Sequence, residues 1–197
     1  MENILARDYI LLVDASSSMT LPYKRGEDLS RWNYVKEAAY ALAVECEKVD
    51  PDGIELYTFA SKVKALGSVK SNEVNDLFEA NEPFGRTNLT AALEQVFDNW
   101  DPEVPATIVV ITDGQPDNAN TAAEAIVRVT RRMDADEQLA ITFIQVGDDT
   151  NAKNFLKFLD DQLTSSMGAE FDIVDTIDCD AMMERPLSET LIAAISD

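Results

Sequence analysis

Three short and uninterrupted apolar runs constrain the fold of this chain more than any other feature. They are residues 9–13 (YILLV), 106–112 (ATIVVIT) and 139–146 (LAITFIQV). Each run is rich in β-branched residues and lacks the alternation of a strand with one solvent-exposed face, so each is typical of a central strand covered on both faces. The runs therefore predict a largely parallel sheet between two layers of helices.

The segments between the runs complete an α/β pattern. Residues 54–59 (IELYTF) predict another strand with a hairpin partner near 63–66, and residues 171–174 (FDIV) predict a short last strand. Helices are expected over residues 30–49, 87–100, 120–133, 152–163 and 181–195, and Ser30 is the expected N-cap of the first. Strands that alternate with helices indicate an α/β fold with right-handed crossovers. No repeat or linker interrupts the pattern, so we expect one domain over residues 1–197.

The charge and composition exclude several classes of function. Sixteen Lys and Arg residues stand against 37 Asp and Glu residues, giving a formal net charge of −21. This field repels phosphate backbones and anionic lipid and concentrates cations, so we expect neither a nucleic-acid nor a membrane partner. The chain has no histidine, which removes Ser-His-Asp and Cys-His nucleophiles and every His-ligated metal site. Few enzymes could be built from what remains, and we do not expect an enzyme.

The cysteines and the N-terminus favour a cytoplasmic location. Cys46 and Cys179 have no metal-ligand spacing and form no disulfide framework, and they are interpreted as free thiols in a reducing compartment. The first residues, MENILARDYI, lack the successive regions of a secretory signal, and no window has the apolar length of a membrane span. We therefore expect a cytoplasmic protein.

Polar residues follow two of the apolar runs directly. The first run leads into Asp14-Ala15-Ser16-Ser17-Ser18, and the run 106–112 leads into Asp113-Gly114. Gly85-Arg86-Thr87-Asn88 opens the helix that lies between them in the sequence. Open α/β sheets bind ligands at the carboxyl ends of their strands. Two carboxylates and three hydroxyls are therefore expected to meet at one edge of the sheet.

A divalent cation would make this arrangement favourable. Asp14 and Asp113 would lie close together and partly desolvated, which is costly unless their charge is neutralised. The hydroxyls of Ser16, Ser18 and Thr87 are neutral oxygen ligands that add no charge. Such a set suits Mg²⁺ or Mn²⁺, suits Ca²⁺ less well, and disfavours Zn²⁺. The sequence therefore predicts a metal site formed by these five residues.

The same residues resemble a known family. DASSS at 14–18, GRTNL at 85–89 and ITDGQPD at 111–117 resemble, in chain order, the three parts of the metal-ion-dependent adhesion site (MIDAS) of von Willebrand factor A-type (VWA) domains. QVGDDTNAKNFLKFLDDQ at 145–162 is similar to the family's fifth strand and the helix after it. The resemblance covers roughly residues 7–195, and stand-alone domains of this size resemble bacterial cytoplasmic proteins of tellurite-resistance and stress-response type.

The resemblance implies a fold and a function. It implies a doubly wound, mostly parallel six-stranded sheet of order 3-2-1-4-5-6, with one antiparallel edge strand and helices on both faces. It implies that the five residues bind the metal directly or through water and leave one position for water or for an Asp or Glu of a partner protein. The expected function is thus a metal-dependent protein–protein interaction module. In some members of the family the C-terminal helix shifts when the metal shell changes, and the helix over 181–195 is the segment that could do so here.

Two alternatives and two surface features remain open at this stage. A structural domain with a silent metal site is one alternative. A metal-dependent phosphohydrolase of haloacid dehalogenase type is the other, although its Asp-x-Asp pattern is missing because position 16 is Ser. Arg86, beside Thr87, either steers an anionic partner or is a solvated rim charge. The loop over residues 19–29, with Lys24 and Arg25, either contacts a partner or is plain surface.

Overall fold

A six-stranded sheet forms the centre of the protein in the computed structural model, which describes residues 7–23, 26–47, 53–114 and 116–177. The strands are β1 (Asp8–Asp14), β2 (Ile54–Phe59), β3 (Val63–Val69), β4 (Ala106–Thr112), β5 (Leu139–Gln145) and β6 (Val174–Ile177). Their order is β3-β2-β1-β4-β5-β6, and every pair is parallel except β2–β3. The predicted strand order and the antiparallel edge strand are confirmed.

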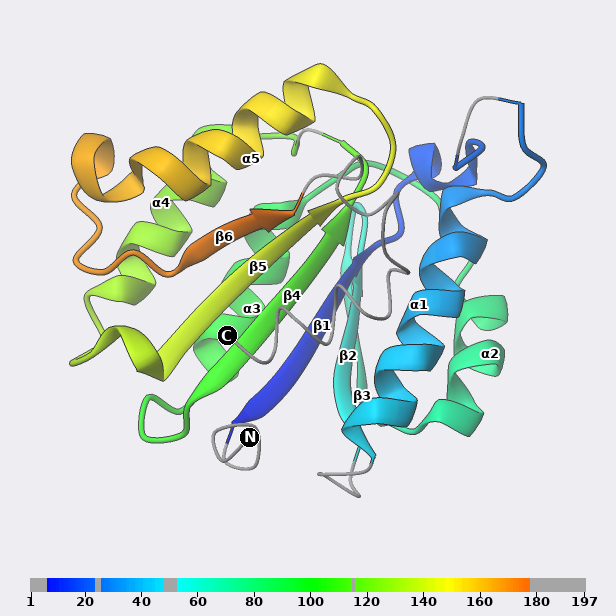
Figure 1. Cartoon of the computed structure of the whole chain (residues 1–197), viewed down its shortest axis with the longest axis horizontal. Coiled ribbons are helices and arrows are strands. Elements are labelled where there is room, and N and C mark those ends of the chain that lie inside the picture. The colour runs from blue at the N-terminus through cyan, green and yellow to red at the C-terminus, as the bar shows by residue number, and fades with distance from the viewer. Residues whose placement is uncertain (1–6, 24–25, 48–52, 115, 178–197) are drawn as a thin grey trace.

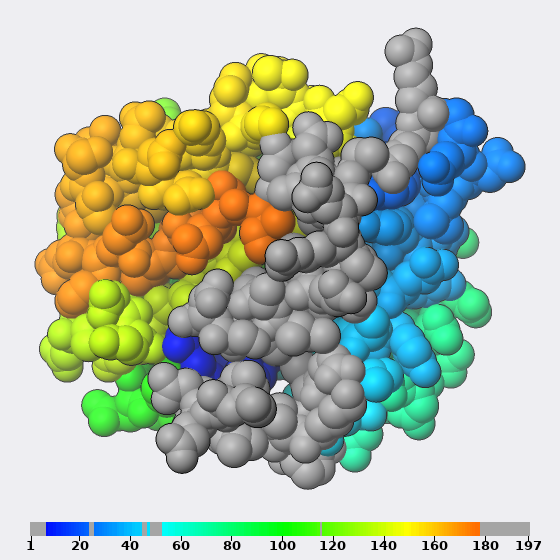
Figure 2. Space-filling model, in the orientation of Figure 1, coloured from blue at the N-terminus to red at the C-terminus, as the bar shows by residue number. Residues whose placement is uncertain are grey.

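Helices cover both faces of this sheet (Figure 1). They are α1 (Arg31–Cys46), α2 (Ser71–Ala80), α3 (Leu89–Asn99), α4 (Ala119–Thr130) and α5 (Thr150–Gln162). Buried side chains of α1 and α2 share one hydrophobic core, and those of α3, α4 and α5 share the other. The space-filling view shows α1 and α2 on one side of the molecule and α5 with β6 on the opposite side (Figure 2).

The central strands supply both cores at once. In β1, Ile10 and Leu12 belong to one core, whereas Leu11 and Val13 belong to the other. All seven residues of β4 are buried. Because successive side chains of a strand point to opposite faces, a strand covered on both sides is apolar at most positions and does not alternate with polar residues. The uninterrupted runs in the sequence have this physical cause.

One helix was missing from the sequence-based interpretation. Helix α2 follows β3 and buries only Val74 and Phe78. It packs beside α1, where the Trp32 indole nitrogen donates a hydrogen bond to the Phe78 carbonyl oxygen, 3.3 Å away. Two apolar residues four positions apart are a weak periodic signal, and the tertiary contact with α1 completes the burial of this helix.

Several predicted boundaries differ from the observed ones. Helix α3 begins at Leu89 rather than at residue 87, because the Asn88 side chain caps it by accepting a hydrogen bond from the Ala91 backbone N–H. The last strand is β6, not residues 171–174; it begins where Val174 pairs with Ile141 of β5. The helix expected over 181–195 lies outside the described residues. No described helix is long and apolar enough to cross a membrane.

Candidate metal centre

Asp14 is the last residue of β1, and its side chain lies in the interior. The residue has 0% exposure. One carboxylate oxygen, Oδ1, accepts a hydrogen bond from the Ser16 backbone N–H at 2.8 Å, and Oδ2 accepts one from the Thr112 hydroxyl at 2.6 Å. Thr112 was not among the predicted site residues, and it fixes the carboxylate from the neighbouring strand β4. Asp14 is therefore held rigidly at the carboxyl end of β1.

A chain of hydroxyl groups leads from the β1 loop to Asp113. The Ser16 and Ser18 hydroxyl oxygens are 3.0 Å apart and hydrogen-bonded, and the Ser18 hydroxyl donates to Asp113 Oδ1 at 2.8 Å. Ser16 and Asp113 are buried, while Ser18 is half-buried. The alternation of residues 14, 16 and 18 thus directs three side chains to one side of a tight loop, next to the end of β4.

The surroundings of Asp14 disfavour its ionised form. Burial raises the pKa of this carboxyl to about 6, the hydrogen bond from Thr112 lowers it, and the nearby Asp113 carboxylate raises it. A carboxylate in such a position is stabilised by a proton or by a cation. A positive charge beside Asp14 would therefore stabilise its ionised form.

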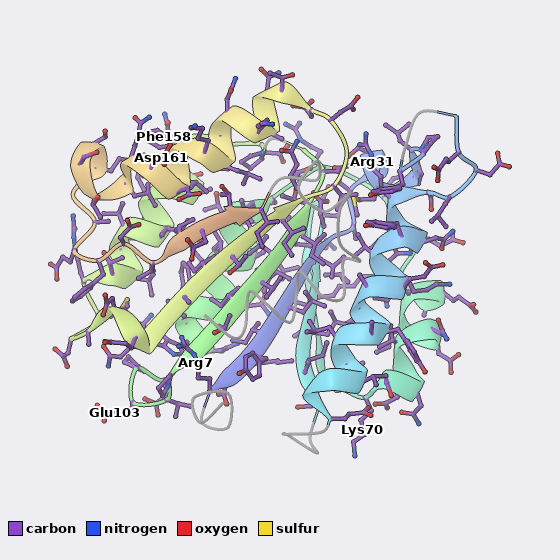
Figure 3. All side chains as sticks on the ribbon, viewed as in Figure 1. Arg7, Arg31, Lys70, Glu103, Phe158 and Asp161 are labelled. Carbon is purple, nitrogen blue, oxygen red and sulfur yellow. The ribbon has the colours of Figure 1, made fainter. Side chains whose placement is uncertain are left out.

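Arg31 supplies a positive charge to the neighbouring Asp113, and the sequence analysis missed this residue. Its guanidinium Nη1 donates to Asp113 Oδ2 at 2.7 Å, and the Arg31 and Asp113 side chains are 12% and 0% exposed. Figure 3 labels Arg31 at the start of α1, near the carboxyl ends of the strands. Gly147 has a positive φ of 90°, and a Cβ atom there would come within 2.7 Å of the guanidinium. No sequence motif identifies an arginine at the first position of a helix as a site residue, so only the structure reveals the contact between Arg31 and Asp113.

The loop that contains Thr87 is docked against the same edge. The Ser17 backbone N–H donates to the Gly85 carbonyl oxygen at 3.1 Å, and the Gly85 N–H donates to the Ser17 hydroxyl at 2.9 Å. The Thr87 carbonyl oxygen accepts from the Asp117 N–H. Thr87 is half-buried, and the hydrogen bonds between described site residues do not include its hydroxyl. The structure thus links four predicted ligands directly and places the fifth on an adjoining loop.

Arg86, next to Thr87, lies on the exposed rim of this edge. Its Nε is 3.1 Å from Asp117 Oδ1, and the two side chains are 77% and 36% exposed. An exposed pair of this kind contributes little to stability. The interpretation of Arg86 as a solvated rim charge fits this exposure, although its exposure also leaves it accessible to a partner.

The side chains at this edge fit a hard divalent cation. They offer two buried carboxylates and neutral hydroxyl oxygens, and the pKa of Asp14 is raised by burial first and by the neighbouring Asp113 carboxylate as well. Within the described part of the chain, no group of three or more His, Cys, Asp or Glu residues could hold a metal. Hydroxyl oxygens of the kind present here are neutral hard ligands, which Mg²⁺ and Mn²⁺ accept.

Comparison with protein families matches residues 9–115 to the von Willebrand factor type A domain. The chain belongs to this family. The matched range is more than half of the chain and contains all five predicted ligands. Type A domains generally serve as interaction modules rather than as enzymes. A search of curated proteins gave no match.

Solved structures of low sequence identity share the type A fold. The PilB minor pilin from Streptococcus sanguinis is 13% identical, with a TM-score of 0.69 over 100% of this chain and 62% of the pilin. The manganese-loaded TRAP protein from Plasmodium vivax is 20% identical, with a TM-score of 0.59 over 94% of this chain and 74% of that one.

A third similar structure is a von Willebrand factor type A protein from Catenulispora acidiphila. It is 16% identical, with a TM-score of 0.64, and the match covers 96% of this chain and 43% of that protein. The chain therefore spans less than two thirds of the pilin and less than half of the C. acidiphila protein. Identities this low establish the type A fold and nothing about the partners of this domain.

Proposed function

We propose that this type A domain binds one divalent cation, Mg²⁺ or Mn²⁺ rather than Ca²⁺, and through it a partner protein. The proposed ligands are Asp14, Ser16, Ser18, Thr87 and Asp113. The bound cation would supply a Lewis-acidic position for a carboxylate oxygen of the partner. We place the protein in the cytoplasm, in keeping with two cysteines whose spacing forms no disulfide framework, and in a bacterial stress-response assembly of the kind that its motifs resemble.

The observation that carries this proposal is the hydrogen-bonded chain from Asp14 through Ser16 and Ser18 to Asp113. It gathers hard oxygen atoms around two buried carboxylates at the ligand-binding edge of an open α/β sheet. Ser18 and Thr87 are half-buried, so this group of side chains is partly open to solvent. An Asp or Glu side chain from another protein could approach there, and a charge-assisted contact in such a place discriminates strongly between partners.

Metal binding is tested by calorimetric titration with Mg²⁺ and with Mn²⁺. Wild-type protein is expected to release or absorb heat with a stoichiometry of about one ion per chain. Asp14→Asn and Asp113→Asn are expected to bind at least roughly tenfold more weakly, because each removes a charged ligand. Asp161→Asn is the matched control, since Asp161 is an exposed residue of α5 on the far side of the molecule from Arg31 (Figure 3). Equal affinity in all four proteins contradicts the proposed ligands.

The partner contact is tested separately by affinity capture from lysate with and without a chelator. Proteins held through the cation are expected to be released by EDTA and restored by added Mg²⁺. The Asp161→Asn variant should capture the same proteins as wild type. Capture that is insensitive to chelation contradicts a metal-mediated contact.

A silent site is the second candidate, and the Arg31–Asp113 pair favours it. The guanidinium supplies one positive charge to the buried Asp113 without any metal. If this charge suffices, the domain serves as a structural unit, and the titrations with Mg²⁺ and Mn²⁺ give no heat and no change in melting temperature. The pKa of Asp14, raised mainly by burial, favours the metal-binding candidate, because Arg31 pairs with Asp113 and not with Asp14.

A further inference from the structure

A pocket opens directly beside the candidate metal centre. Its volume is about 280 Å³. Ala15, which stands between Asp14 and Ser16 in the chain, forms part of its wall. The other residues used in the argument below are Phe59, Lys62, Lys64, Glu82 and Phe84. The pocket therefore lies on the same edge of the sheet as the carboxylates, between the end of β1, the β2–β3 hairpin and the loop after α2.

Phe84 makes the rim of this pocket apolar. Its side chain is highly exposed, at 83%, which is the largest value among the exposed large hydrophobic residues of the described chain. Its position is nevertheless fixed, because its backbone N–H donates to the Ala15 carbonyl oxygen at 2.8 Å. The next residue, Gly85, lies so close to the Ser61 side chain that a Cβ would come within 2.6 Å of the hydroxyl oxygen. An aromatic ring held in solvent by a rigid backbone is prepared for binding at low entropic cost.

The pocket also has basic residues in a strongly acidic protein. Lys62 and Lys64 line it, against the single acidic residue Glu82. Lys64 Nζ donates to the Asn81 side-chain oxygen at 2.9 Å, whereas Lys62 is exposed and forms no ion pair with any described residue. Charges beyond about 8 Å are largely screened at physiological ionic strength. The pocket therefore presents two lysines and one acidic side chain in a protein of net charge −21.

We propose that this pocket binds an apolar side chain of the partner segment whose carboxylate reaches the metal centre, and that Lys62 and Lys64 attract the acidic residues of that segment. The inference rests on the proposed function and adds the chemical class of the partner, an extended peptide with an apolar anchor and acidic neighbours. Because Ala15 separates pocket and centre by one residue, the anchor and the metal-binding carboxylate lie within about three residues of each other in the partner.

The inference is tested with random peptides of about a dozen residues displayed on phage and selected against the full chain in Mg²⁺. The selected peptides should combine an acidic residue with a large apolar residue within about three positions. Affinities of synthetic copies are then measured by fluorescence anisotropy for wild type and variants. Phe84→Ser and Lys62→Glu are each expected to weaken binding roughly tenfold or more, with Mg²⁺ affinity within about twofold of wild type.

Matched controls are available on the same protein. Tyr40→Ser removes another exposed aromatic residue, on α1, and Lys70→Glu reverses a charge beyond the opposite end of β3, far from Arg31 in Figure 3. Both are expected to bind the peptides as wild type does. The proposal that the pocket binds an apolar side chain fails if the selected peptides lack an apolar residue, or if Phe84→Ser and Lys62→Glu bind them with unchanged affinity. Either result leaves the proposed function intact. Peptide binding that persists in EDTA overturns the proposed function instead.

Discussion

Asp14 links the stability of the domain to its proposed ligand. The residue is fully buried, and its pKa is raised to about 6 by burial first and by the neighbouring Asp113 as well. The ionised carboxylate is thus less stable in the folded protein than in the unfolded chain, where a pKa of 3.8 applies. A cation that binds only the folded form would reverse this penalty.

Asp14→Asn is expected to stabilise the metal-free domain at neutral pH. Between about pH 4 and pH 6 the folded state retains a proton on Asp14 that the unfolded state has lost. The contribution of Asp14 to the free energy of unfolding of the wild type therefore falls as pH rises. Asn does not titrate, so the variant lacks this pH-dependent loss. Its free energy of unfolding should exceed that of the wild type by up to about 3 kcal/mol above pH 6, and by nothing near pH 4. Urea unfolding of both proteins in EDTA across this range measures the difference. A variant that is less stable at neutral pH shows that Asp14 carries no such penalty.

Arg31 compensates the charge of Asp113 at the same edge of the sheet. Its ion pair with Asp113 Oδ2 leaves Oδ1 to the Ser18 hydroxyl, so the two oxygens of one carboxylate have separate partners. Removing one member of a buried pair generally costs about 3–5 kcal/mol, because it leaves the other charge unpaired. Arg31 therefore keeps the metal-free domain folded, and its positive charge must also weaken the attraction of the centre for a cation.

At the scale of the elements, the strand ladders extend into the loops of the site. The Ala15 backbone N–H donates to the Phe59 carbonyl oxygen, and the Val146 N–H donates to the Thr112 carbonyl oxygen. Each bond continues the parallel pairing one step beyond the strand ends. The loops after β1 and β5 consequently leave the sheet in fixed directions, and the turn at Gly147 brings its backbone against Arg31.

Gly147→Ala is expected to destabilise the domain by about 2–4 kcal/mol. The added Cβ would meet the Arg31 guanidinium at 2.7 Å, and the φ of 90° is also unfavourable for alanine. Gly168→Ala is the matched control, because Gly168 has a φ of 73° with nothing within 4 Å of the added Cβ. The control should lose only about 1 kcal/mol. Denaturant titration of both variants provides the measurement, and equal losses would mean that contact with Arg31 adds nothing.

At the scale of the whole molecule, two cores oppose a large negative charge. The sheet buries apolar side chains on both faces, which is the main driving force for folding. A net charge of −21 opposes compaction through self-repulsion and at the same time attracts cations. Stability and cation binding should therefore respond to ionic strength in opposite directions.

Raising NaCl from about 20 mM to about 300 mM is expected to stabilise the metal-free protein and to weaken its Mg²⁺ affinity. Screening reduces the repulsion in the folded state, and it also reduces the attraction of the centre for a cation. A gain of roughly 1 kcal/mol would raise the melting temperature by about 2–4 °C. Calorimetric melting in EDTA and metal titration at both salt concentrations measure the two effects. A melting temperature that falls with added salt contradicts a dominant role for self-repulsion.

The sequence predicted most of the sheet because its signals are local. Residues 9–13, 106–112 and 139–146 are mostly apolar and show no polar–apolar alternation, and all three segments are central strands. Helix α2 was missed because its burial depends on α1 rather than on its own pattern. The start of β6 was misplaced because pairing with Ile141 of β5 sets its register, and no residue of β6 encodes that partner.

Asp14, Ser16, Ser18 and Asp113 could be grouped from the sequence, since each lies at or just after the end of a strand and parallel strands end at a common edge. The sequence by itself thus determined the fold family and the oxygen atoms available to a cation. Only the tertiary structure decided which donor groups contact the two carboxylates. Arg31 is separated from Asp113 by 82 positions and Thr112 from Asp14 by 98, and contacts over such separations arise from packing, which leaves no periodic trace in the chain.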